Sequence, residues 1–362
     1  MRTATFGVAA GLAFALLASG AAAQQPPPQP PPPTPPPTPQ PLQPILTDGQ
    51  RAAILRAGQR HVLLAYGQLT HAIVRQRLSP FGAPATPVAA GGAPAAAYAS
   101  LDAAAAIPLW NAWVGPSATW SERDHPVFGY DGTQIAGSVG VDRRIGDATV
   151  LGAFGLYEDS DFDTVGSGAL RGRLGGAGVY VGGALTDILV YDALAIWQGG
   201  ESTLRDATAR GTYDTERWAL AGNLTAYLTA GAFQISPTVG IGWVSDRQSA
   251  YRDTAGVLYP GLTVETTTVR AGAEIARTFQ AAGAATLTPF ASATALWDVS
   301  RDESPTPATP TDDLPRLDYA LSVGLRAAPT PATSLSLEVE ASALGRAGYS
   351  VITVSGQLGF RF

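Results

Sequence analysis

The residues best suited to catalysis or metal binding are few, because the chain of 362 residues holds three histidines and no cysteine. The lack of cysteine excludes thiolate nucleophiles, cysteine-bound metals and disulfide bridges. His61 and His71 stand ten positions apart, which on a helix leaves them about 80° away from a shared face. Zinc ligands on one helix stand four residues apart, as in H-E-x-x-H. We therefore expect no metal site and interpret both histidines as pore-facing or solvated side chains.

The third histidine, His125, follows Asp124 in a predicted loop. An acid–histidine pair can serve a hydrolase, but such an enzyme also needs a positioned nucleophile, and the sequence has no G-x-S-x-G elbow. The glycine-rich run from Gly172 to Gly178 is not a nucleotide loop, because no helix is predicted after it. We predict that the protein is not an enzyme and carries no cofactor. A hydrolase built on Asp124 and His125 stays as an alternative.

The charge balance excludes another class of function. The chain has 23 basic and 29 acidic residues and a net charge of −6. A nucleic-acid partner needs a basic face that displaces counterions. We therefore expect no nucleic acid among the partners.

Four segments precede the main part of the chain. Residues 1–23 have the features of a secretory signal peptide, with Arg2, an apolar stretch and a small-residue cleavage site before Gln24. Residues 24–46 are Pro-rich and predict an extended, disordered linker. Residues 47–79 predict an amphipathic helix that starts at Thr47 or Asp48 and ends before Pro80. Residues 80–107 predict an Ala/Gly-rich loop.

From residue 108 onward the hydrophobic period changes to two. Residues 233–243, 317–326, 334–343 and 352–362 alternate apolar with small or charged side chains, and aromatic residues stand near the ends of the apolar face. This combination is typical of strands whose apolar face meets lipid and whose polar face lines a lumen. No apolar run after the signal peptide is long enough for a spanning helix. A closed barrel would then satisfy the backbone within the membrane.

The connections indicate how many strands there are. We count about twelve in residues 108–362, joined alternately by short turns, such as Gly146-Asp147, and by longer loops, such as 159–168, 199–212 and 245–261. Short periplasmic turns, longer outer loops and an even number of strands are typical of single-chain outer-membrane barrels. The predicted fold is all-β: a transmembrane antiparallel up-and-down β-barrel of about twelve strands with an N-terminal α-helix.

The alternation also assigns charged side chains to the lumen, namely Asp142, Asp192, Arg217, Arg270, Glu274, Asp318, Arg326, Glu338 and Glu340. The helix at 47–79 carries arginines at five positions, Arg51, Arg56, Arg60, Arg75 and Arg77. Opposite charges attract more strongly in a narrow pore of low dielectric than in water. We therefore expect the helix arginines to pair with lumenal acids. The alternative is that these charges line a hydrated channel.

Several stretches resemble the autotransporter β-barrel (translocator) family. They are GYDGTQIAGSVGVDRRIGDATVLGAFGLYEDSDFD from Gly129, RGRLGGAGVYVGGALTDILVYDALAIWQGG, ISPTVGIGWVSDRQSAYRDTAG and the terminal Gly359-Phe360-Arg361-Phe362. The resemblance spans residues 108–362. It implies a helix that threads the pore, for which residues 47–79 are the candidate. It also implies that the outer-membrane barrel-assembly machinery recognises the aromatic end, Phe360 and Phe362.

The chain departs from that family upstream of the helix. Residues 24–46 show no repeat and no globular pattern, so the chain resembles a translocator with little or no passenger. Family members that release a passenger cut at an asparagine in the pore helix. Here the asparagines are Asn111 and Asn223, both outside the helix, so we do not expect that cleavage.

Together these features predict an outer-membrane barrel of a Gram-negative bacterium, reached by signal-peptide export. It would thread, display or anchor the short Pro-rich segment. The alternative is a porin-like diffusion channel whose N-terminal arm stays in the periplasm, where the cell wall would be a further partner. The other expected partners are outer-membrane lipid and the barrel-assembly machinery, and we expect a monomer.

Overall fold

The structure, a computed structural model, describes residues 47–62, 66, 73–74, 77, 109–127, 129–146, 148–165, 168–206, 208–281, 285–304 and 315–362. The predicted signal peptide (1–23), Pro-rich linker (24–46) and Ala/Gly-rich loop (80–107) lie outside the described residues. Within the described part, no helix is both long and apolar enough to cross a membrane.

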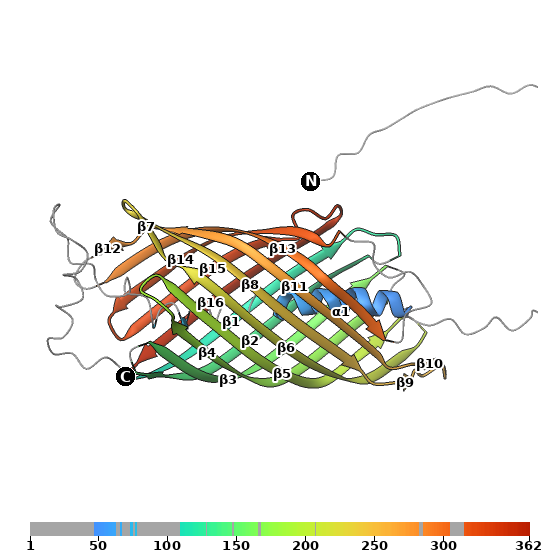
Figure 1. Cartoon of the computed structure of the whole chain (residues 1–362). Helices are drawn as coiled ribbons and strands as arrows, with labels where there is room; N and C mark the ends of the chain where they lie inside the picture. Colours follow the sequence, from blue (N-terminus) through green and yellow to red (C-terminus); the bar gives the residue numbers. More distant parts are fainter. Residues whose placement is uncertain are drawn as a thin grey trace, which may run out of the picture. The chain divides into compact units, whose positions relative to one another are not determined.

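Twelve long strands form one closed antiparallel sheet (Figure 1). They are β1 (Trp110–Arg123), β2 (Tyr130–Ile145), β3 (Thr149–Thr164), β4 (Ala169–Ala184), β5 (Leu189–Arg205), β6 (Arg210–Ala226), β8 (Phe233–Gln248), β11 (Leu262–Ala276), β13 (Thr286–Ser304), β14 (Leu317–Thr330), β15 (Thr333–Ser342) and β16 (Tyr349–Arg361). The sheet closes where β1 pairs with β16, with Trp120 opposite Ile352. Each of these strands therefore has a partner on both sides, as a barrel in lipid requires. The predicted fold, an antiparallel barrel of 12 strands with an N-terminal helix, is confirmed.

The two ends of the barrel differ. At one end, which we call the turn end, short connections such as 146–148, 185–188 and 331–332 join the strands. There Trp110 and Phe362 exchange backbone hydrogen bonds of 3.1 Å, and the short strands β7 (Leu228–Ala230) and β12 (Phe279–Gln280) lie at the same end (Figure 1). The opposite end, the loop end, carries the hairpin of β9 (Tyr251–Arg252) and β10 (Leu258–Tyr259) and the connection 305–316.

The loop end has shorter loops than the sequence predicts. Residues 159–168 and 199–212 are mostly strand, so the connections shrink to 165–168 and 206–209. The physical reason is pairing across strands on the outer wall. Arg171 lies 2.8 Å from Asp161, and Arg173 lies 3.1 Å from Asp159. Charged residues that suggest a loop in the sequence instead form cross-strand pairs that extend the sheet.

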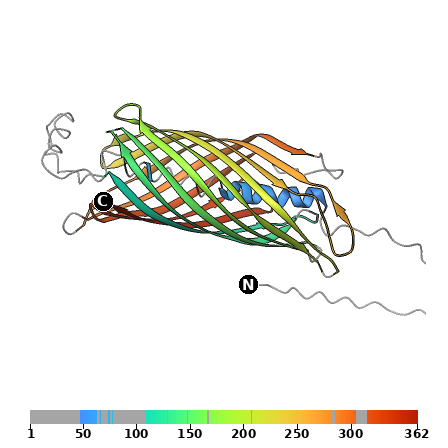
Figure 2. The same ribbon diagram turned by 90° about the horizontal axis from the view of Figure 1, so that it is seen from below.

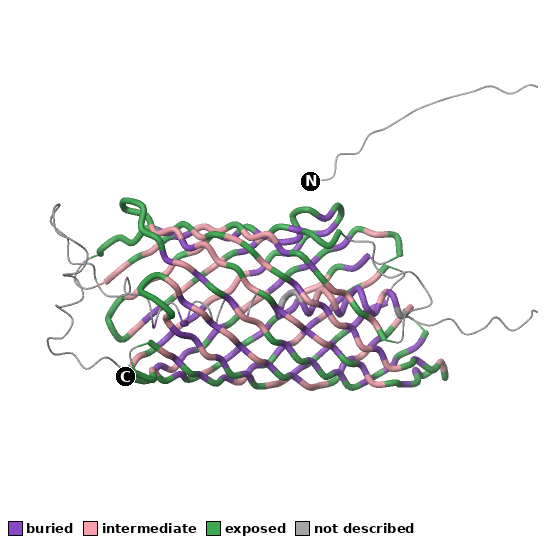
Figure 3. Tube along the Cα trace, viewed as in Figure 1, coloured by how far each residue is buried: buried purple, intermediate pink, exposed green. Residues whose placement is uncertain are grey.

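Buried and exposed residues alternate along the strands (Figure 3), as expected when successive side chains point to the lumen and to the outer wall in turn. On β2, Val141 is 41% exposed while the adjacent Asp142 is 1% exposed. Exposed aromatic residues on the outer wall form two bands. The band toward the loop end comprises Trp120, Trp197, Trp218, Trp297 and Tyr319, and the band at the turn end comprises Trp110, Phe233, Phe279, Phe360 and Phe362. Two aromatic girdles around an apolar belt are typical of a barrel in a membrane.

Inside the barrel, glycines make room for large rings on neighbouring strands. The ring of Phe154 lies over Gly178, where an added Cβ would stand 2.3 Å from the ring. Trp113 lies over Gly140 in the same way, at 2.4 Å from an added Cβ. A side chain at either position would force the ring to move. These glycines therefore allow the lumenal wall to pack closely around aromatic side chains.

We expect Gly178→Ala to lower the free energy of unfolding by about 1–3 kcal/mol, because the Phe154 ring must move to relieve the overlap. Gly175 is a matched control on the same strand, since no atom lies within 4 Å of an added Cβ there. Gly175→Ala should change stability by less than about 0.5 kcal/mol. Urea titration of the barrel in lipid vesicles, followed by gel migration of unheated samples, measures both. Equal losses in the two variants would contradict the role of the Phe154–Gly178 contact.

Candidate functional site

The helix α1 (Asp48–His61) lies inside the barrel, toward the loop end (Figures 1 and 2). Thr47 is its N-cap and forms a capping box with Gln50. The Gln50 backbone N–H donates to Thr47 Oγ1 (3.2 Å), and the Thr47 backbone N–H donates to Gln50 Oε1 (2.8 Å). Gln50 Nε2 also donates to the carbonyl oxygen of Val127 (2.7 Å), which lies in the loop between β1 and β2. The helix therefore begins at the loop end.

The β9–β10 hairpin packs against the first turn of α1. Its Tyr251 and Tyr259 rings stack with centroids 4.6 Å apart, and Tyr213 of β6 stacks on Tyr251 at 4.8 Å. The Arg51 guanidinium lies 5.5 Å from the Tyr259 centroid and donates a hydrogen bond to Gln248 Oε1 (3.2 Å). A cation–π contact and a buried hydrogen bond thus join the start of the helix to β8 and to the hairpin.

A buried ion cluster on the barrel wall faces the last turn of α1. Arg217 Nη1 lies 3.0 Å from Glu158 Oε1, and Arg217 Nε lies 2.7 Å from Asp246 Oδ1. Gly58 of α1 stands against this cluster, since an added Cβ would be 2.9 Å from Arg217 Nη2. The two carboxylates fix the guanidinium, so a larger side chain at position 58 would have to displace a paired, buried cation.

Two further polar contacts hold the same part of α1 to other strands. Gln59 Nε2 donates to the carbonyl oxygen of Val264 (2.8 Å), and Gln59 Oε1 accepts from Thr266 Oγ1 (2.7 Å). Arg56 forms an ion pair with Glu303 on β13. Because β6, β8, β11 and β13 are consecutive strands of the sheet, these contacts hold the helix to one side of the lumen.

Four of the described residues after α1 are hydrophobic and buried against the lumenal wall. Val62, Tyr66, Ile73 and Val74 belong to one cluster with side chains of the barrel. Tyr66 stacks on Phe154 with centroids 6.3 Å apart. Val74 occupies the space beside Gly182, where an added Cβ would stand 2.2 Å from it. These four residues therefore pack against the wall as a hydrophobic core.

At the turn end, Arg77 forms the last of these contacts. Its Nε lies 3.0 Å from Asp142 Oδ1, and its Nη2 donates to the carbonyl oxygen of Leu109 (2.8 Å), the residue before β1. Asp142 also accepts from Asn111 Nδ2 (2.7 Å) and from the Tyr180 hydroxyl (3.0 Å). Each of these donors stabilises the buried carboxylate.

In chain order, the contacts of the described residues between 47 and 77 run from the loop end to the turn end. Gln50 contacts a loop-end loop, Gly58 contacts the mid-wall cluster, and Arg77 contacts the turn end. The N-terminal segment therefore occupies the lumen with Thr47 at the loop end. Among the described residues, no three His, Asp or Glu side chains group closely enough to hold a metal ion.

A family model, the autotransporter beta-domain, matches residues 112–340, which is more than half of the chain. The chain belongs to the autotransporter β-domain family. Comparison with curated proteins finds no match.

The autotransporter barrel has similar solved structures. The translocator domain of the autotransporter NalP from Neisseria meningitidis has a TM-score of 0.59 at 13% identity, covering 83% of this chain and 99% of that one. The beta domain of the Bordetella autotransporter BrkA has a TM-score of 0.59 at 16% identity, covering 70% and 100%. The transport unit of AIDA-I from Escherichia coli has a TM-score of 0.50 at 14% identity, covering 71% and 91%. The resemblance to translocator barrels is thus confirmed.

The structure places the charged residues predicted for the lumen of the autotransporter barrel as follows. Asp142, Asp192, Arg217, Asp318 and Glu340 are buried, and Glu338 shares the inward face of β15 with Glu340. Several of them pair between wall strands: Arg326 lies 2.6 Å from Glu274, and Arg270 donates to Asn223 (2.8 Å), which donates to Asp192 (2.7 Å). Asp318 lies 3.1 Å from Arg346, which stands in the connection between β15 and β16.

The helix arginines differ in what they contact. Arg77 and Arg56 pair with acids of the barrel, Asp142 and Glu303, whereas Arg51 contacts Gln248 and Tyr259. The side chains of Arg60 and His61, and the whole of Arg75 and His71, lie outside the described residues.

Sequence reasoning misses the partners of Arg217. Asp246 follows the alternation of β8 and Glu158 that of β3, so extending each alternation would find them. The loop predicted at 245–261 begins before Asp246, although β8 continues to Gln248. The sequence gives no such signal for Gly58 or Gln59. A glycine inside a predicted helix indicates only a local loss of helix stability.

Asp124 and His125 lie in the loop between β1 and β2. His125 Nδ1 accepts a hydrogen bond from the Val127 backbone N–H (3.1 Å), and the Asp124 backbone N–H donates to the Gly348 carbonyl oxygen (2.6 Å). These contacts stabilise the loop. They bring no hydroxyl nucleophile to His125, so they lend no support to the hydrolase alternative.

Removal of Arg217 should destabilise the barrel strongly, because Glu158 and Asp246 would stay buried without their cation. We expect Arg217→Ala to cost about 3–5 kcal/mol of unfolding free energy. Arg173→Ala, which removes an exposed pair on the outer wall, should cost less than about 1 kcal/mol. Urea titration in lipid vesicles compares the two. Similar small losses would mean that water screens the lumenal cluster.

Proposed function

We propose that this autotransporter barrel inserts in the outer membrane and threads its N-terminal segment, so that residues 24–46 are displayed outside the cell. The observation that carries the proposal is the order of contacts, with Gln50 at the loop end and Arg77 at the turn end. Short turns of single-chain barrels face the periplasm, and longer loops face outward. Whatever precedes Thr47 in the chain would then leave the barrel on the outer side.

The second part of the proposed role is closure of the pore. Ion pairs hold the segment through Arg56 and Arg77, and the apolar residues Val62, Tyr66 and Val74 pack against the lumenal wall between them. Apolar side chains inside a pore oppose the passage of hydrated ions, which supports closure by this segment. The lack of asparagine in 47–79 supports a helix that stays in place and anchors the displayed residues.

Delivery completes the proposal. A signal peptide at 1–23 would direct export, and the barrel-assembly machinery would recognise Phe360 and Phe362. Both side chains are exposed on the outer wall at the turn end, Phe362 at 68%. On the orientation above, that end faces the periplasm, where such a partner can reach it. We expect the inserted barrel to be a monomer in contact with lipid.

The alternative function is a porin-like channel with a periplasmic N-terminal arm that reaches the cell wall. That arrangement needs residues 24–46 at the turn end. The contact of Gln50 with Val127 at the loop end favours threading instead.

A short epitope tag inserted after Gln24 tests display. On intact cells we expect antibody labelling of this tag, because the residues before Thr47 leave the lumen at the loop end. A tag between Pro331 and Ala332, in a turn-end connection, should be labelled only after the outer membrane is opened. A tag after Gln24 that also needs opened cells would support the periplasmic arm.

Ion conductance in a planar bilayer tests closure. Deletion of residues 47–79 should give a large, steady conductance, since the lumen loses its filling. Arg56→Ala combined with Arg77→Ala should give a smaller, flickering increase, because two ion pairs with the wall are lost. Arg171→Ala with Arg173→Ala, which changes the outer wall, is the control and should match the parent. No conductance after the deletion would argue against closure by this segment.

A further inference from the structure

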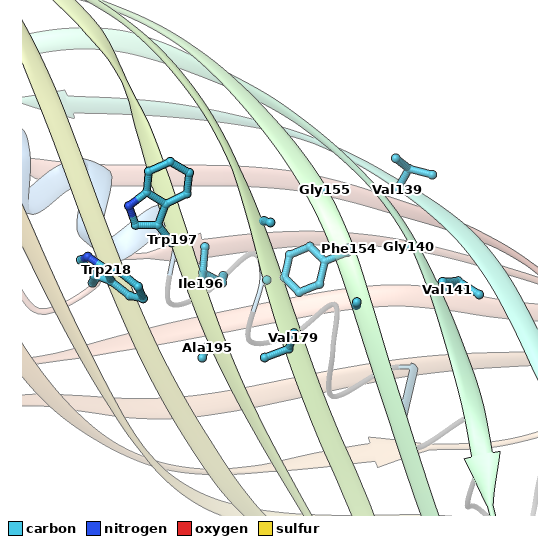
Figure 4. Close-up of a pocket in the computed structure, with 13 residues that line it drawn as sticks. Val139, Gly140, Val141, Phe154, Gly155, Val179, Ala195, Ile196, Trp197 and Trp218 are labelled. Atoms are coloured by element: carbon cyan, nitrogen blue, oxygen red, sulfur yellow. The ribbon is translucent and has the colours of Figure 1, made fainter.

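The outer wall between β2 and β6 has a shallow furrow inside the apolar belt. Its volume is about 660 Å³, within the range of small-molecule sites. Small residues of β3, β4 and β5 create the hollow, among them Gly155, Ala177 and Ala195. Larger side chains border it, namely Val139, Val141, Val179, Trp197 and Trp218. Figure 4 shows Val139 and Val141 at one end and the two indoles at the other.

A single carboxylate holds both indoles at that end of the furrow. Trp197 Nε1 and Trp218 Nε1 donate to the same oxygen of Glu216, at 3.1 and 3.2 Å. With their N–H groups satisfied, the rings present apolar faces to the furrow. The furrow is therefore bordered by fixed side chains.

The valine end of the furrow leads to an arginine. Arg143 stands on the outward face of β2, two positions from Val141, and its guanidinium lies 5.4 Å from the centroid of the exposed Trp110 ring. No carboxylate of the described residues pairs with it, whereas Arg171 and Arg173 at the loop end pair with Asp161 and Asp159. Stacking on a ring leaves the N–H groups in the guanidinium plane available, and these match a phosphate in geometry and charge.

The spacing fits a lipid. Val141 and Val139 lie about 7 and 14 Å from Arg143 along the strand, and the usual strand tilt makes this about 5 and 10 Å of depth in the membrane. Half of the hydrocarbon core of a bilayer is about 15 Å thick. A headgroup at Arg143 in the turn-end aromatic band would therefore place its acyl chain along these valines and into the furrow.

We propose that Arg143 and the furrow together bind one anionic phospholipid from the leaflet at the turn end. The phosphate accepts hydrogen bonds from Arg143, and one acyl chain packs into the furrow beside Gly155. The site depends on the barrel lying in lipid, and it holds whether or not residues 24–46 are displayed. The proposed site would bind one phospholipid specifically, in addition to the non-specific contact of the outer wall with membrane lipid.

The molecule supplies a matched comparison at the turn end. The Arg277 guanidinium lies 5.7 and 4.8 Å from the centroids of Phe233 and Phe279. It has the same charge and a similar aromatic setting, but the furrow is lined by other strands. Arg277→Gln therefore removes the same charge without touching the furrow.

The furrow can also be filled without disturbing the barrel. An added Cβ at Gly155 points to open space, with its nearest neighbour, the Gly176 carbonyl oxygen, 3.9 Å away. Gly155→Leu should therefore fold and occupy the hollow. Gly222 on β6 is the control, because its nearest neighbour is 3.7 Å away and it does not line the furrow.

The test is native mass spectrometry of the delipidated full chain in detergent, titrated with phosphatidylglycerol. We expect one tight binding event in the parent. Arg143→Gln should weaken it about tenfold, the effect of losing a hydrogen bond to a charged group. Gly155→Leu should weaken it several-fold, while Arg277→Gln and Gly222→Leu leave it near the parent value. Inorganic phosphate at millimolar concentration should not displace the lipid.

Three results would overturn the proposal. Equal binding by all variants would show that lipid binds the apolar outer wall non-specifically, with no site at Arg143 or the furrow. Displacement by inorganic phosphate would show a simple anion site at Arg143. A dimer in analytical ultracentrifugation that Gly155→Leu separates would show that the furrow is an interface between two copies. Gel migration of unheated samples checks that each variant is folded.

Discussion

Charge enclosed by a closed wall must be paired, and most of the structure follows from that constraint. Closure of the sheet satisfies the backbone in lipid, but it also places carboxylates and guanidinium groups in a confined space. A buried ion without a partner is costly. Arg217, with Glu158 and Asp246, meets the requirement within the wall. Asp142 meets it with a cation from the N-terminal segment, Arg77.

That division between wall and segment explains how the segment is held. Its polar contacts lie along α1 and at Arg77, and the residues described between His61 and Arg77 are hydrophobic. Polar contacts define position, because a hydrogen bond depends on distance and angle, while apolar packing adds cohesion without direction. The absent Cβ of Gly58 against Arg217 adds a steric requirement on register. The lumen thus favours one placement of this segment.

Much of the fold can be predicted from the sequence, because lipid on one side and a lumen on the other impose a strict period of two. The closed sheet, its antiparallel order and the inward position of residues such as Asp142 and Asp318 follow from that period. The extent of the strands does not. At 159–168 the pairs of Asp159 and Asp161 with arginines of β4 extend the sheet, and local composition cannot reveal a partner on another strand.

The candidate site was predictable only in part. The sequence indicates arginines on the segment and acids in the lumen, but not which of them meet. Glu303 pairs with Arg56 across more than two hundred residues of chain, and that match depends on the depth and rotation of α1. Gln59, which bonds two groups of β11, shows the same limit, since its role arises only after the segment is seated.

The strand extensions at the loop end determine how far the sheet reaches beyond the aromatic band. From Trp197 in the aromatic band to Arg205 at the end of β5 there are eight residues, about 27 Å along a strand. With the tilt usual for such barrels, this is a rise of about 20 Å. The loop-end rim of the sheet therefore lies well beyond the aromatic band, which marks the edge of the membrane. On the proposed orientation, the residues before Thr47 would leave the barrel at this rim and not at the membrane surface, so even a short displayed segment would begin at a distance from the lipid.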